Sequence, residues 1–418
     1  MQKNLFGSTF AGNFDGRNAT HSAGRGEVFH DWFPYLEGFS SGFVNDILTQ
    51  KFDAPKLLLE PFCGVGTTPL TLAQMGVSCG YCEVNPFLLE LVKAKSVAFT
   101  FSRRKKKKVD DEFSQISEKI TGFVKKVTPD ADLSTSFQDT FGDVKYFSEP
   151  NKTTVLKLKT VEKELIGKTI KPFYRVIVAS SLLEASLLKR AGDVKYKTKK
   201  DLIEGVPDII KLIKTKIEIL QRDITKLPDN ARFGEVFLFS ENAKDLVQHK
   251  NQKFEGVITS PPYLNGTNYI RNTKLELWYL GYLSNKADLR NYRGSVVTSA
   301  INDVSKASGL SVIDEAKEVV RKIESNCYDK RIPRMVAAYF DHMKLIAKGI
   351  YKNLIDAAPV CIDIGDSVYG GEHVPTHDIL ADVFSSSGFK YENSVILRKR
   401  FSNQGAPLTQ RLLFFRKK

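Results

Sequence analysis

The sequence predicts an α/β fold in which a doubly wound, Rossmann-like sheet is interrupted by an inserted, mainly helical region. Two observations carry this prediction. Short apolar runs of strand length alternate with segments of helical periodicity in both halves of the chain, and a long stretch of mixed composition separates those halves. We therefore expect residues 1–102 and 233–418 to form the two parts of the sheet domain, and residues 103–232 to form the insertion.

The first half opens with a strand, a glycine turn and a helix. The apolar run Leu57-Leu58-Leu59 is short enough for a buried parallel strand, and Gly64 and Gly66 follow it at once. A β-α-β-α order of this kind begins a doubly wound sheet. The predicted elements are a strand at 56–60, a helix at 67–75, a strand at 77–83 and a helix opening at Asn85-Pro86.

The second half restores the strand pattern. Apolar runs bounded by polar or turn residues predict strands at 237–239, 256–259 and 360–364, and helical spacing predicts helices at 275–282 and 335–354. A closing pair of strands at 393–398 and 411–415 is expected around the turn sequence Asn403-Gln404-Gly405-Ala406-Pro407.

The overall charge and composition limit the class of protein. The 62 Lys and Arg residues outnumber the 48 Asp and Glu residues, and the net charge of +14 favours a polyanionic partner such as nucleic acid. There is no apolar run of about 18 residues, and Met1–Gly16 lacks the pattern of a secretory signal. The five cysteines are too few for a disulfide framework. We expect a cytoplasmic protein without membrane partners.

The glycine turn is a candidate cofactor site. In Glu60-Pro61-Phe62-Cys63-Gly64-Val65-Gly66 the glycines allow a tight turn and a close approach of backbone to ligand. Glu83, at the end of the next strand, could accept hydrogen bonds from both hydroxyls of a ribose. A third glycine and a Gly-Lys-Ser/Thr sequence are absent, so a nucleoside cofactor without phosphates fits better than NAD or ATP. The alternative is a turn that only packs a helix on the sheet.

The sequence Thr259-Ser260-Pro261-Pro262-Tyr263 is a candidate catalytic segment at the carboxyl end of a predicted strand. The prolines fix the backbone and lack amide hydrogens, so neighbouring carbonyls can accept hydrogen bonds from a ligand. The Ser260 Oγ and the Pro261 carbonyl could orient both N–H bonds of an exocyclic base amine, and Tyr263 could stack on a base rotated out of the duplex. The alternative is a proline-bounded strand end with an ordinary surface tyrosine.

Together these two segments resemble those of amino-group DNA methyltransferases, which carry Phe-x-Gly-x-Gly for the cofactor and Asp, Asn or Ser before Pro-Pro-Tyr for the base. The resemblance implies S-adenosylmethionine (S-adenosyl-L-methionine) as cofactor and double-stranded DNA as substrate. The Thr-Ser-Pro-Pro-Tyr form is most like the N4-cytosine enzymes of bacterial and archaeal restriction-modification systems, whose cognate restriction endonuclease would act separately. Adenine N6 as the target, an amine of RNA or protein as a more distant target, and a nucleic-acid-binding protein with an inactive core stay open as alternatives.

The resemblance also assigns site residues. Segment 30–39 is similar to the stretch that covers the methionine end of the cofactor, although its aromatic residues also suit simple packing. Segment 240–245 is similar to the loop at the adenine ring, with Glu241 where Asp is usual. The expected catalytic residues are Ser260, Pro261, Pro262 and Tyr263. The expected cofactor-binding residues are Phe39, Glu60, Phe62, Gly64, Gly66, Thr67, Glu83 and Asn242.

Other signals point away from different chemistries. Cys79-Gly80-Tyr81-Cys82 has redox spacing but falls within a predicted strand, and the six histidines are scattered, so no metal is expected. No Pro-Cys is present, which disfavours cytosine C5 methylation through a covalent intermediate. The basic run Arg103–Lys108 suits a solvated linker or phosphate contact. Target recognition would reside in the insertion and in residues 286–334.

Overall fold

The computed structural model describes residues 14–35, 37–102, 106–190, 193–229, 231–249, 252–305, 311–402 and 405–418. Some of the sequence expectations lie outside these residues: most of the segment Met1–Gly16, half of the basic run Arg103–Lys108, and Asn403-Gln404 in the closing turn.

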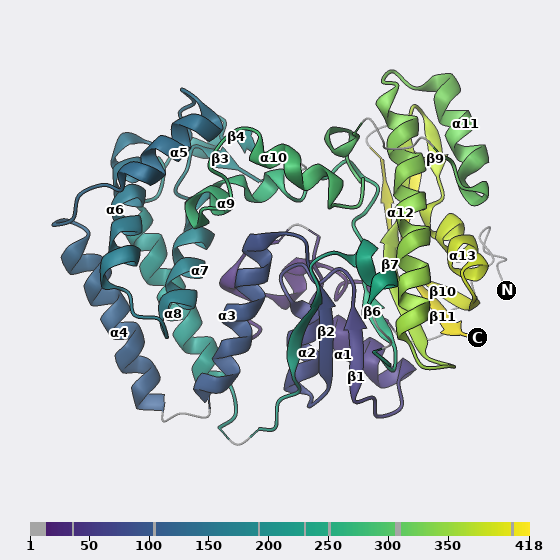
Figure 1. The fold of residues 1–418 in the computed structure, drawn as a ribbon, viewed down its shortest axis with the longest axis horizontal. Coiled ribbons are helices and arrows are strands. Elements are labelled where there is room, and N and C mark those ends of the chain that lie inside the picture. Colours follow the sequence, from purple (N-terminus) through teal and green to yellow (C-terminus); the bar gives the residue numbers. More distant parts are fainter. Residues whose placement is uncertain are drawn as a thin grey trace.

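The central sheet is the predicted doubly wound α/β sheet (Figure 1). In the described residues it has seven strands in the order β10-β11-β7-β6-β1-β2-β5. The five strands from β5 to β7 in this order pair in parallel, whereas β11 is antiparallel to both β7 and β10. The strands are β1 (Leu57–Glu60), β2 (Ser78–Cys82), β5 (Val236–Ser240), β6 (Val257–Thr259), β7 (Pro359–Gly365), β10 (Phe389–Phe401) and β11 (Pro407–Lys417).

The strand order reverses at β1. From β1 the chain runs outward through β2 to β5, and it then returns to place β6 on the other side of β1, with Leu59 paired to Val257. Ligands of open α/β sheets bind at the carboxyl ends of the strands beside such a reversal. The turns after β1 and β6, which carry the two candidate motifs, therefore lie next to each other.

Helices cover both faces of the sheet. Successive side chains of a strand point to opposite faces, and here the side chains on both faces are apolar. Leu58 packs among residues of α1 and α2, whereas Leu59 packs among residues of α12 and α13, and both leucines are fully buried. On the first face lie α1 (Ser41–Lys51), α2 (Thr67–Gln74) and α3 (Pro86–Ser102), and on the second lie the 3-10 helix η4 (Ala243–Gln248), α12 (Arg331–Asn353) and α13 (Thr376–Ser386).

The insertion is mainly helical, as predicted. Its helices gather beside α3, across the molecule from β10 and β11 (Figure 1). They share a continuous apolar core with α3 and with α9 (Lys274–Leu280). The elements are α4 (Lys106–Phe123), α5 (Ala131–Phe141), α6 (Glu149–Leu165), α7 (Lys171–Leu182), α8 (Ile209–Lys226), a short hairpin of β3 (Leu188–Lys189) and β4 (Lys195–Tyr196), and the 3-10 helix η3 (Lys200–Leu202).

A buried ion-pair network fixes the insertion to the sheet domain. The Arg175 guanidinium on α7 donates to both carboxylate oxygens of Glu90 on α3, at 2.6 and 2.7 Å, and to Glu162 on α6 at 2.7 Å. A second anchor is Asp223 on α8, which accepts from the Phe29 amide at 2.8 Å and from the Trp32 indole at 3.0 Å. These bonds hold α3 and the N-terminal segment against the helical body.

The sequence analysis did not anticipate several elements. These are α1, α13 and the long continuation of β10 and β11. The others are α10 (Asp288–Asn291), α11 (Lys317–Asn326), the hairpin of β8 (Ser367–Tyr369) and β9 (Glu372–Val374), and the 3-10 helices η1 (His21–Gly24), η2 (His30–Trp32), η5 (Arg271–Thr273), η6 (Tyr292–Gly294), η7 (Ile301–Asp303) and η8 (Asp314–Ala316). In the described part of the chain no helix combines the length and apolarity that crossing a bilayer requires.

Removal of the Arg175 side chain should destabilise the protein. In Arg175→Ala the carboxylate of Glu162, which is 2% exposed, keeps Lys159 at 3.1 Å but loses its guanidinium partner, and Glu90 on α3 loses its partner as well. We expect the free energy of unfolding to fall by about 3 kcal/mol, as measured by urea denaturation. Arg17→Ala is the control, because Arg17 pairs with Asp15 in solvent and is 90% exposed. Equal midpoints for the two variants would contradict the anchoring role of Arg175.

Candidate functional site

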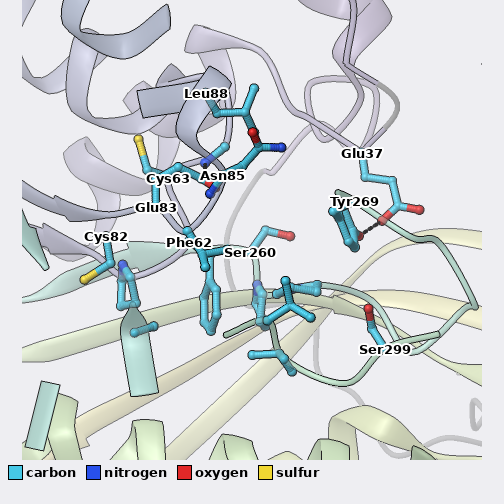
Figure 2. A pocket seen from close by; sticks show the side chains of 18 of the residues that line it. Glu37, Phe62, Cys63, Cys82, Glu83, Asn85, Leu88, Ser260, Tyr269 and Ser299 are labelled. Atoms are coloured by element: carbon cyan, nitrogen blue, oxygen red, sulfur yellow. Dashed lines mark hydrogen bonds between the residues drawn. The ribbon is translucent and has the colours of Figure 1, made fainter. Parts of the chain in front are cut away.

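A cavity lies at the carboxyl ends of β1, β2 and β6, with about 1050 Å³ of empty space that includes its opening to solvent (Figure 2). It brings together most of the residues that the sequence analysis selected from distant parts of the chain. The expected site residues that line it are Phe39, Phe62, Gly64, Thr67, Glu83, Asn242, Ser260, Pro261, Pro262 and Tyr263. Glu60 and Gly66 do not line it.

Gly66 shapes the turn from behind the cavity wall. Its φ of 88° is in the left-handed region, and a Cβ there would lie 2.9 Å from Cγ2 of Val92. Glycine is therefore required at this position for the backbone conformation and for close packing of α3. The carbonyl of the intervening Val65 accepts from the buried Lys95 ammonium group at 2.8 Å, which fixes the turn from the same side.

Glu83 holds the glycine turn and faces the cavity. One carboxylate oxygen accepts from the Gly64 amide and the other from the Asn85 amide, both at 2.8 Å. Burial raises the pKa of the Glu83 carboxyl to about 7. Because each carboxylate oxygen can accept a second hydrogen bond, the ionised group retains acceptor capacity for two ligand hydroxyls.

Glu60 connects the two motifs instead of lining the cavity. Its side chain is 1% exposed, and it accepts from the Phe62 amide at 2.9 Å and from the Thr259 hydroxyl. Burial raises the pKa of the Glu60 carboxyl to about 7. The residue that ends β1 is thus bonded to the residue that ends β6.

Asp363, at the end of β7, anchors the catalytic segment. Its carboxylate accepts from the Tyr263 hydroxyl at 2.8 Å and from the Ser260 hydroxyl at 3.4 Å. Gln410 on β11 donates to both of its oxygens, at 2.9 and 3.0 Å. The sequence analysis placed Asp363 only in a strand and turn. The sequence feature that could have identified Asp363 as a site residue is an acidic side chain in an otherwise apolar strand.

This network sets the orientation of the Ser260 hydroxyl. Burial raises the pKa of Asp363 to about 6, so the carboxyl is ionised at neutral pH. The Ser260 oxygen lies 3.4 Å from this carboxylate, and a hydroxyl that donates to it keeps its lone pairs available on other sides as acceptors. Figure 2 shows Ser260 between the Phe62 and Glu83 side of the cavity and the Tyr269 side.

Glu37 joins the N-terminal segment to the loop that follows the catalytic segment. Its carboxylate accepts from the Asn265 amide at 2.6 Å, from the Thr267 hydroxyl at 3.0 Å and from the Tyr269 hydroxyl, the last drawn as a dashed line in Figure 2. The sequence analysis had singled out only Phe39 in this segment. Nothing in the sequence indicated that Glu37 would reach residues 265–269.

The far wall contains Asn242 and part of the segment 286–334. Asn242 caps η4 by accepting from the Lys244 amide at 3.0 Å. The Lys244 ammonium group in turn donates to the carbonyls of Gly294 at 2.5 Å and Val296 at 3.2 Å. This holds residues 295–297 against the cavity, which they line. The sequence analysis had not connected that segment with the site.

The Cys79 and Cys82 thiols do not form a redox site. Both are buried and free, and they belong to apolar clusters on opposite faces of the sheet. Burial raises the pKa of both thiols, which keeps them protonated.

Comparisons with known proteins were made at the levels of sequence and structure. No protein-family model matches the chain. The chain is similar to the type II methyltransferase M.BsoBI of Geobacillus stearothermophilus, at 24% identity over 93% of this chain and 84% of that one. It is also similar to the type II methyltransferase M.AvaI of Nostoc sp., at 22% identity over 90% of this chain and 82% of that one.

Two solved structures are similar at low scores. One is a SAM-dependent methyltransferase of Methanosarcina mazei, with a TM-score of 0.32 and 8% identity, covering 89% of this chain and 96% of that one. The other is the rRNA methyltransferase aviRa of Streptomyces viridochromogenes, with a TM-score of 0.29 and 10% identity, covering 92% of this chain and 87% of that one. At these scores neither bears on function. The similarity that supports a methyltransferase is that of the sequence relatives, which extends over nearly the whole chain.

Proposed function

We propose that the chain is a site-specific DNA methyltransferase of a restriction-modification system, which transfers a methyl group from S-adenosylmethionine to N4 of a flipped cytosine. The observation that carries this proposal is that Glu83 and the glycine turn share one cavity with Ser260–Tyr263. The two type II methyltransferases, which match about nine-tenths of the chain, support it.

The residues of the cavity fit S-adenosylmethionine. The ionised Glu83 carboxylate would accept from both ribose hydroxyls, and the Gly64 turn allows the backbone to approach the ligand. Val84, Leu88 and Asn242 also line the cavity and would offer an adenine ring apolar walls and a polar group. Phe39 would cover the methionine end. When bound, the cofactor supplies an electrophilic methyl group.

The catalytic segment would hold the target base. A cytosine amine is a weak nucleophile because its lone pair is delocalised into the ring. The Ser260 Oγ and the Pro261 carbonyl would accept hydrogen bonds from the two N–H groups of the amine. These bonds would direct its lone pair toward the methyl group. Tyr263 would stack on the flipped base, with its hydroxyl held by Asp363 and Gln410. The N6 amine of adenine needs the same two acceptors and is the second candidate target.

The direct test is to incubate the purified protein with labelled S-adenosylmethionine and mixed-sequence duplex DNA, followed by digestion and chromatography of the nucleosides. We expect N4-methylcytosine. N6-methyladenine would keep the fold and mechanism and overturn the base assignment drawn from Ser260. Absence of any modified base, together with absence of cofactor binding, would favour a nucleic-acid-binding protein with an inactive core.

Ser260→Ala should separate catalysis from cofactor binding. Loss of a positioned acceptor costs about 2.7 to 4 kcal/mol in the transition state, so kcat should fall about 100- to 1000-fold. The Kd for S-adenosylmethionine, measured by calorimetry, should not change. Ser325→Ala, at an exposed position of α11 away from the cavity, is the matched control and should keep most of the activity. Wild-type kcat in Ser260→Ala would remove Ser260 from the mechanism.

Asp363→Asn tests the orientation of the Ser260 hydroxyl. The new amide presents a donor to Tyr263, Ser260 and Gln410, and a hydrogen bond to a charged group contributes about 1.5 to 3 kcal/mol. We expect kcat to fall about 10- to 100-fold, with cofactor affinity and the circular dichroism spectrum unchanged. Asp382→Asn, at an exposed position of α13, is the control. An unaltered kcat in Asp363→Asn would mean that Asp363 does not position Ser260.

Cofactor affinity should depend on pH through Glu83. Only the ionised carboxylate can accept from both ribose hydroxyls, and its pKa in the free protein is raised to about 7. Binding therefore favours the deprotonated form, and affinity should rise roughly tenfold from pH 6 to pH 8. Titration calorimetry in two buffers of different ionisation enthalpy should detect proton release near pH 7. Glu83→Gln should bind weakly at every pH, and an unchanged pH dependence in this variant would exclude Glu83.

A further inference from the structure

A second cavity lies on the other side of Tyr263 from the candidate active site. It has about 780 Å³ of empty space, which includes its opening to solvent, and it shares four lining residues with the first cavity, namely Glu37, Gly38, Phe39 and Tyr263. Its remaining lining is polar for the most part and comes from the N-terminal segment, the loop after the catalytic segment, β7, β10 and β11. These residues are Ala19, Thr20, His21, Asn265, Asp363, Arg398, Arg400 and Gln410.

Two arginines of β10 supply the positive charge of this cavity. Arg398 and Arg400 are two residues apart on one strand, so their side chains project from the same face. Arg398 is paired with Gln410 of β11, which lines the same cavity. Arg400 donates to the Asp366 carbonyl at 3.1 Å. Both arginines are exposed, and within the described ranges of the chain neither forms an ion pair.

Two carboxylates also line this cavity, Asp363 and Glu37, and the charge of Arg398 acts on Asp363. The Asp363 carboxylate accepts hydrogen bonds from Tyr263, Ser260 and Gln410. The Glu37 carboxylate accepts hydrogen bonds from Asn265, Thr267 and Tyr269. Burial lowers the pKa of the His21 imidazole to about 3, so it is neutral. The guanidinium groups are therefore the charged donors available to a ligand.

We infer that this second cavity binds a phosphate group of the DNA backbone next to the target nucleotide, through Arg398 and Arg400. The inference rests on the proposed function. A base that enters the active site past Tyr263 leaves its sugar and flanking phosphates at the mouth, and the second cavity opens beside that point. Planar guanidinium groups bind phosphate oxygens in a fixed geometry, which would set the register of the strand without reading its sequence.

The test is the double variant Arg398→Gln/Arg400→Gln, with a fluorescent mixed-sequence duplex as probe in anisotropy titrations at several salt concentrations. We expect a roughly tenfold weaker Kd and a salt dependence whose slope falls by about one. The KM for the duplex should rise, whereas the affinity for S-adenosylmethionine should stay as in the wild type.

Lys399→Gln is the matched control, because it removes one positive charge from the same strand on the opposite face. Arg398→Lys/Arg400→Lys should restore most of the salt slope, since the charges are kept. If the glutamine double variant binds the duplex like Lys399→Gln, the phosphate site is overturned while the proposed function stands. A wild-type protein that neither binds nor methylates the duplex would overturn the proposed function and this site together.

Discussion

The parallel pairing of β1 with β6 is the constraint on which the rest of the site depends. Leu59 pairs with Val257, and one step further along the Glu60 carboxylate accepts from the Thr259 hydroxyl. This contact joins the last residue of one strand to the last residue of the other. A glycine turn and a proline-rich turn that lie far apart in the sequence consequently open into a single cavity.

The insertion occupies the chain between the two halves of the site without separating them. Arg175 and Asp223 dock it on α3 and on the N-terminal segment, and α3 begins directly after Glu83. Displacement of the helical body would therefore move α3 and residues 29–32 as well. The N-terminal segment is also bound to the site itself through Glu37, so the site walls are supported on two sides.

The fold, and the candidate motifs that the structure places at one cavity, could be read from the sequence because they leave local signals. Apolar runs of strand length, the glycines at 64 and 66 and the prolines at 261 and 262 are all readable without tertiary contacts. Asp363 and Glu37 were not predictable as site residues, because their roles arise from neighbours that only folding brings together. Glu60 was expected to bind the cofactor because it belongs to the glycine motif, but its side chain is buried and accepts a hydrogen bond from Thr259. Helix α1 was missed because its first residues continue an aromatic, glycine-containing segment.

The central claim is that one cavity holds both the cofactor and the target base. A crystal structure of the protein with S-adenosylhomocysteine and a duplex carrying the methylated site would test it most directly. The account predicts the ribose hydroxyls within hydrogen-bond distance of Glu83, and an extrahelical base whose exocyclic amine faces Ser260 and the cofactor sulfur. A nucleoside bound away from Glu83, or a base held in another pocket, would contradict it.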